Sequence, residues 1–136
     1  MMPGETDLQQ LLSGIEPLLD DVIYTFCTIP LDSPIPPGCI GSFNEREGRT
    51  LILPLEIAMT APALTDVKWA GEWAKITLQI HSSLEAVGFI AAIATALGIE
   101  GISANVMSGF YHDHVFVQWG RRGDAMTVIR GFAKKE

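Results

Sequence analysis

The stretch WAKITLQI at residues 73–80 alternates apolar and polar side chains. The apolar members Ile76, Leu78 and Ile80 share one face, and the polar members Lys75, Thr77 and Gln79 share the other. A period of two is typical of a β-strand that buries one face. We therefore predict a half-buried strand over 73–80, and the elements around it decide the fold.

The residues that follow predict a helix, two strands and a second helix. Ser83 is placed to cap a buried helix that runs to about Leu97, where Gly98 and Gly101 end it. Strands are predicted over 102–107 and 114–119, around a turn at 108–113. The last helix is predicted to begin near Asp124 and to present four apolar residues inward: Ala125, Val128, Ile129 and Phe132. One more strand would complete a ferredoxin-like βαββαβ sandwich of the α+β class.

The first half of the chain supplies candidates for that missing strand. A short helix is predicted from Leu8, capped by Thr6 or Asp7, and a strand over 22–29. A proline-rich loop spans 30–38, and a hairpin follows over 39–53, where Gly48 can supply a positive φ. Beyond a possible helix start at Leu55, residues 55–72 carry no clear pattern. We predict that the strand over 22–29 fills the vacant position, so that the two halves interlock.

Composition excludes several classes of partner. The 136 residues carry 9 Lys and Arg against 16 Asp and Glu, a net charge of -7 that disfavours nucleic-acid binding. The longest apolar run, at residues 86–99, is too short to cross a bilayer, and the N-terminus does not resemble a secretory signal. We expect a cytoplasmic protein with no membrane partner, in which Cys27 and Cys39 are reduced, packed thiols.

Motifs of common enzyme classes are not found. The sequence contains no GxGxxG, GxxxxGK[ST], GxSxG or HExxH, and Cys27 lacks the surroundings of a nucleophile. We predict a protein without catalytic activity of its own and without a cofactor.

Three segments resemble a bacterial group of tandem ACT-domain proteins of uncharacterised function. They are ITLQIHSSLEAVGF at 76–89, GISANV at 101–106 and YHDHVFV at 111–117, and FNEREGRTLILP at 43–54 is similar to the first half of that group. The resemblance implies two ACT-like halves: an incomplete or permuted one at 1–70 and a C-terminal ACT domain at 71–136. It also implies amino-acid binding near the loop that joins the first strand of a domain to its first helix.

In this sequence that loop contains Ser82, Ser83 and Leu84, with Gly88 one turn further on. Hydroxyl groups and free N–H groups at a helix N-terminus suit a carboxylate, and a missing side chain at Gly88 would let a ligand or a second backbone approach. Capping alone would also account for both serines.

The Tyr111-His112-Asp113-His114 cluster permits a zinc or acid–base interpretation. Two histidines share a side of the chain only if it is extended there, and no other His or Cys pair has metal-ligand spacing. We favour a turn in which Asp113 stabilises the hairpin and Tyr111 lines a pocket or interface. No metal is predicted. The candidate ligand-binding residues are Ser82, Ser83, Leu84, Gly88, Asn105, Tyr111, His112 and Asp113.

Two functions remain open. The first is a regulatory module that binds a small molecule such as an amino acid, and the second is an oligomerising structural or interaction protein with a vestigial pocket. A homodimer or larger assembly is expected in both cases, because an open sheet leaves edge strands that are blunted or paired.

Overall fold

The computed structural model describes residues 7–64, 67–80 and 86–133. Packing divides the chain into two compact units: the first combines Met1–Asp21 with Ala74–Glu136, and the second is Val22–Trp73. The boundary falls inside strand β5 (Trp69–Leu78), which contributes its first half to the second unit and its second half to the first. The sequence division into halves at 1–70 and 71–136 stays a prediction, since it concerns ACT-like halves and not these packing units.

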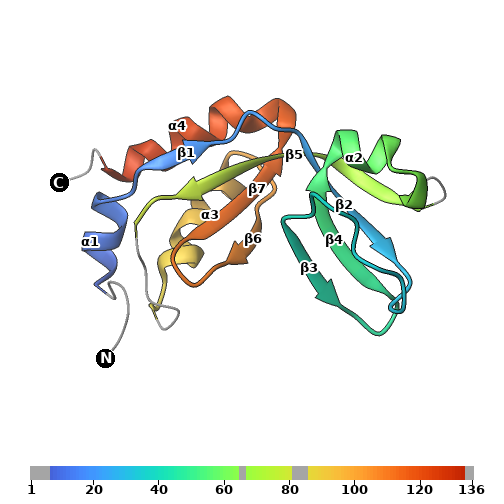
Figure 1. Ribbon diagram of the computed structural model, residues 1–136. Coiled ribbons are helices and arrows are strands. Elements are labelled where there is room, and N and C mark those ends of the chain that lie inside the picture. The colour runs from blue at the N-terminus through green and yellow to red at the C-terminus, as the bar shows by residue number, and fades with distance from the viewer. Residues whose placement is uncertain (1–6, 65–66, 81–85, 134–136) are drawn as a thin grey trace. The chain divides into compact units, whose positions relative to one another are not determined.

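The first unit contains an antiparallel ferredoxin-like sheet with the strand order β1-β5-β7-β6. Besides β5, its strands are β1 (Pro17–Leu19), β7 (Asp113–Gln118) and β6 (Asn105–Ser108). Strand β1 lies along β5, with Leu18 opposite Thr77 (Figure 1). The strand that completes the sheet is therefore β1, ahead of β5 in the chain.

The prediction that residues 22–29 fill this position is only partly right, because β2 (Tyr24–Ile29) pairs with the first half of β5, whereas β1 pairs with the second half, which belongs to the first unit. Pro17, a residue type that stops helices, begins the completing strand. A three-residue strand has too little pattern to be recognised without its partner, because its hydrogen bonds all depend on β5.

Three helices cover one face of this sheet: α1 (Leu8–Ser13), α3 (Phe89–Ile99) and α4 (Arg122–Ala133). Figure 1 shows α4 running beside β1. The core between helices and strands consists of Leu11, Ile15, Ala74, Ile76, Leu78, Phe89, Ile93, Leu97, Ile102, Val115, Val117, Ala125, Met126 and Ile129. Alternate residues of β5 thus point to the helices, as the alternation at 73–80 predicts.

Helix ends agree with the sequence in two cases and depart from it in a third. The Asp7 side chain accepts a hydrogen bond from the Gln10 N–H at 3.1 Å, which confirms a cap on α1. At the other end of α3, Gly101 has φ +73° and the Ile102 N–H donates to the Leu97 carbonyl at 3.0 Å. This is a Schellman ending, in which glycine relieves the steric cost of positive φ. Gly98, which was also predicted to end the helix, lies inside it.

The start of α3 was predicted wrongly. The helix begins at Phe89 behind an N-cap at Gly88, with no side-chain cap. A cap at Ser83 would have required the helix to begin several residues earlier. Gly88 adopts φ +86°, so the backbone turns into the helix at the glycine.

The second unit repeats the ferredoxin-like strand order without the first helix. Its sheet runs β3-β4-β2-β5, with β3 (Gly41–Asn44), β4 (Arg49–Pro54) and β2 (Tyr24–Ile29). The proline-rich loop takes the place of that helix. A short helix α2 (Leu55–Thr60) and a 3-10 turn at Pro62–Leu64 pack on one face over Cys27, Ile29, Leu51 and Leu53. The predicted strand and hairpin of this half are confirmed.

Gly48 closes the hairpin for a different reason from the one predicted. Its φ is not positive. A Cβ atom at Gly48 would lie 2.7 Å from Thr28 Oγ1 and 2.9 Å from the Ile29 carbonyl oxygen. Glycine is therefore required by the close approach of β2. Among the residues that the structure describes, no helix is long and apolar enough to span a membrane.

Candidate functional site

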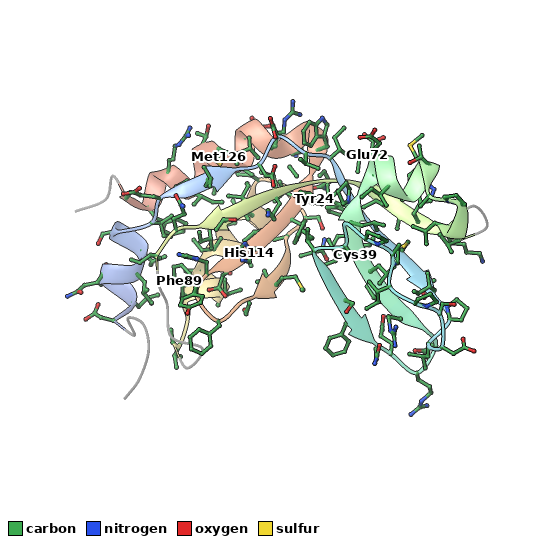
Figure 2. All side chains as sticks on the ribbon, viewed as in Figure 1. Tyr24, Cys39, Glu72, Phe89, His114 and Met126 are labelled. Atoms are coloured by element: carbon green, nitrogen blue, oxygen red, sulfur yellow. The ribbon has the colours of Figure 1, made fainter. Side chains whose placement is uncertain are left out.

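The predicted site residues are only partly described. Ser82, Ser83 and Leu84 lie outside the described residues, so their role stays a prediction. Gly88 stands at the start of α3, where Figure 2 labels the adjoining Phe89. A Cβ atom at Gly88 would lie 3.4 Å from Cδ2 of Leu8, an ordinary contact distance. The described neighbour of Gly88 is thus Leu8 of α1. Glycine is favoured at this position by its positive φ and not by a close contact.

Gly88 and Gly98 distinguish the strain of a side chain at positive φ from the ordinary effect of adding a methyl group to a helix. Gly88→Ala should lower the free energy of unfolding by about 1 to 2 kcal/mol, because an L side chain in the left-handed region is strained. Gly98→Ala should raise it by up to about 1 kcal/mol, because Gly98 lies inside α3 with no described atom near the added methyl group. Urea denaturation of both variants measures the difference. Equal effects of the two substitutions would contradict the assigned backbone geometry.

The β6–β7 turn brings together three of the predicted residues. Tyr111 is 64% exposed and contacts Phe110 edge to face, with ring centroids 5.0 Å apart. The His112 carbonyl accepts a hydrogen bond from the Gly109 N–H at 2.9 Å, which closes the turn. Asp113 begins β7, is only 6% exposed and lies opposite Ser108. Asp113 is therefore a residue of the strand and not of the turn, contrary to the prediction.

Asn105 lies apart from that turn. It begins β6 opposite Phe116, at the other end of the β6–β7 pairing from Asp113. The structure therefore groups Tyr111, His112 and Asp113 and does not place Asn105 with them.

A second polar group on the first unit was missed by the sequence analysis. Thr77 Oγ1 and His114 Nδ1 form a hydrogen bond of 2.9 Å from β5 to β7. Lys75 Nζ lies 3.4 Å from Asp20 Oδ2. Alternation had already placed Lys75 and Thr77 on the face away from the core. The sequence pattern did not reveal that β1 pairs with β5, which brings residues 18–21 beside Lys75 and Thr77.

Burial controls the protonation of His114, which Figure 2 labels on β7. Loss of solvent lowers the pKa of this imidazole below its ordinary value of 6.5, and the positive charge of Lys75 lowers it further. The imidazole is therefore neutral near pH 7. A neutral imidazole has one nitrogen that donates and one that accepts, so Thr77 can serve His114 in either role.

Cys27 is buried in the core of the second unit, and Cys39 is partly buried against that core. Burial raises the pKa of both Cys27 and Cys39, which are free. Protonated thiols are poor nucleophiles, so this pair offers no ready covalent chemistry. Within the part of the chain that the structure describes, no three His, Cys, Asp or Glu side chains converge as a metal site.

Comparison with known proteins defines the class. Two family models, each described as an ACT domain, match residues 3–65 and 71–130. A crystal structure of a protein of unknown function from Vibrio cholerae, described as a possible transport protein, is 38% identical with a TM-score of 0.78. The match covers 93% of this chain and 96% of that one. The chain belongs to the ACT-domain family and contains two ACT domains in tandem.

More distant structures share the fold. A protein from Agrobacterium tumefaciens is 17% identical, with a TM-score of 0.71 over 88% of this chain and 89% of that one. The ligand-free regulatory subunit of aspartate kinase from Thermus thermophilus is 14% identical, with a TM-score of 0.63 over 88% and 97%. No curated protein sequence matches the chain. The matching models describe ACT domains, and neither describes a catalytic domain.

Proposed function

We propose that this protein is a regulatory module that binds an amino acid and has no catalytic activity of its own. The observation that carries the proposal is the pair of ACT-domain matches, which together occupy most of the 136 residues. The fold shared with a regulatory subunit of aspartate kinase supports the same class of function. We propose the cytoplasm as its location and a homodimer or larger assembly as its working form.

The predicted contacts of the ligand are Ser82, Ser83 and Leu84, with the start of α3 and the β6–β7 turn as neighbours. The positions of the described residues support this proposal. His114, the second residue of β7, shares a hydrogen bond with Thr77 near the end of β5, so the turn lies close to where the chain leaves β5 towards α3. The exposed rings of Phe110 and Tyr111 supply apolar surface there.

Thermal unfolding in the presence of each proteinogenic amino acid tests the function. A ligand that binds only the folded state stabilises it, by about 2.7 kcal/mol at a hundred times its dissociation constant. We expect one amino acid, or a few of related chemistry, to raise the melting temperature by several degrees at millimolar concentration. The D-enantiomer is the matched control and should have a smaller effect, because a chiral site distinguishes the two.

Site variants locate the effect. Ser82→Ala and Ser83→Ala should each reduce the shift if the hydroxyl groups contact a carboxylate, whereas Ser42→Ala, on exposed strand β3, should not. If no amino acid changes the melting temperature of the wild-type protein, the regulatory proposal fails. The oligomerising interaction protein then becomes the better account, with sedimentation equilibrium as its direct measurement.

A further inference from the structure

The first unit has a cavity of about 380 Å³ over the β1–β5 pair. Its lining residues are Leu18, Leu19, Asp20, Asp21, Lys75 and Thr77. Because Ala74, Ile76 and Leu78 point to the helices, Lys75 and Thr77 point to the opposite face of the sheet. Leu18 is the cross-strand partner of Thr77 and shares that face. The cavity therefore lies on the face that α1, α3 and α4 leave uncovered.

Opposite charges meet at the edge of this cavity. The side chains of Lys75 and Asp20, 3.4 Å apart, are only 22% and 26% exposed. The Asp20 N–H donates to the Lys75 carbonyl oxygen at 3.0 Å, so the backbone holds the two residues side by side. Asp21 follows directly and is exposed. One ammonium group and two carboxylates thus surround one small volume, where partial burial reduces screening by solvent.

A hydroxyl group completes the polar lining. Thr77 shares a hydrogen bond with His114, and the neutral imidazole can accept from Thr77 or donate to it. When His114 Nδ1 carries the proton, the hydroxyl hydrogen of Thr77 is available to a ligand. Next to it, Leu18 is 53% exposed and offers an apolar surface that a bound molecule would cover.

From this arrangement we infer that the cavity binds the zwitterionic end of an α-amino acid. The ligand carboxylate is received by Lys75 and Thr77, and the ligand ammonium group by Asp20 and Asp21. Each charge of the ligand then meets the opposite charge, and an aliphatic side chain covers Leu18. The volume is near the lower end of the range for small-molecule sites, roughly 300 to 1,000 Å³, which favours a small ligand. This inference rests on the proposed function and assigns it a location other than the connection between β5 and α3.

L-Valine is a suitable probe, because all of the inferred polar contacts go to groups that every α-amino acid carries. Isobutylamine lacks the carboxylate of valine, and isovalerate lacks the ammonium group. Two-dimensional amide NMR of the full chain during titration reports both affinity and location. We expect valine at millimolar concentration to shift the amide signals of residues 18–21 and 75–77. Each single-charge analogue should bind at least about tenfold more weakly, because one charge-assisted interaction is lost.

Variants of the lining supply the decisive comparison. Lys75→Met and Asp21→Asn should each weaken valine binding at least about tenfold. Lys68→Met and Asp32→Asn remove the same charges from exposed residues of the second unit and should leave valine binding unchanged. Thr77→Val keeps a β-branched strand residue without the hydroxyl group, and should weaken valine and isovalerate without affecting isobutylamine. It also tests the site if Lys75→Met proves unstable.

The possible failures are distinguishable. If valine shifts signals at residues 86–88 and 109–113 and Lys75→Met leaves its affinity unchanged, the inferred location is wrong while the proposed function stands. The same conclusion holds if valine shifts no signal although another amino acid raises the melting temperature. If no amino acid binds at all, the proposed function itself fails.

Discussion

Leu11→Ala should lower the free energy of unfolding of the first unit by about 2 to 5 kcal/mol, the usual cost of a cavity left by a fully buried leucine. Leu11 lies in α1, far in sequence from most of the first unit. It has no exposed surface and packs in the core formed by α3, α4 and the sheet. Urea denaturation followed by tryptophan fluorescence measures the change. Leu31→Ala removes the same atoms from a side chain that is 43% exposed, and should change stability by no more than about 0.5 kcal/mol.

Removing α1 and β1, and then restoring them at another place in the chain, tests whether they belong to the first folding unit. Residues 74–136 lack both α1 and β1, and we expect them not to unfold cooperatively when expressed alone. Joining residues 7–21 after α4 through a flexible linker restores the missing strand and the Leu11 contact, and should restore a cooperative transition. If residues 74–136 alone are as stable as the joined form, then α1 and β1 are not part of this folding unit.

Gly48→Ala should destabilise the second unit by about 1 to 3 kcal/mol, the usual range when atoms are added to a filled space. The new Cβ would lie 2.7 Å from Thr28 Oγ1 and 2.9 Å from the Ile29 carbonyl oxygen, so β2 and the hairpin would have to separate. The melting temperature and the dispersion of the amide signals of the hairpin measure the effect.

A double variant distinguishes the two close contacts. Thr28→Ala removes the hydroxyl oxygen but leaves the Ile29 carbonyl, so adding it to Gly48→Ala should recover only part of the lost stability. Gly120→Ala is the matched control, because no described atom lies within 4 Å of its added methyl group. A Gly48→Ala protein as stable as the wild type would refute the close approach.

Local signals were sufficient for much of the fold. The alternation at 73–80, the Asp7 cap and the glycine ending of α3 each act within a few residues, and the structure confirms them. The hairpin around Gly48 was also found, although for the wrong reason. The ACT-type fold followed from sequence segments together with element order, and the family matches confirm it.

The candidate site was less accessible to sequence reasoning. Ser83 is a good cap residue, yet α3 begins at Phe89 because Gly88 adopts the turn into the helix. A favourable cap residue indicates where a helix can begin, and the packing of Phe89 in the core favours the later position. The cavity beside Lys75 could not be recognised, since its other wall is formed by residues almost sixty positions earlier.

Side-chain patterns over a few residues were enough to predict which segments bury a face, most of the turns between them, and the family of the chain. Such patterns did not show which strand completes the first sheet. That choice depends on hydrogen bonds between β1 and β5 and on the burial of Leu11 among α3 and α4. Pairing between distant segments leaves no periodic trace in either one, so the position of β1, and with it the charged cavity on the open face, appeared only once the chain was folded.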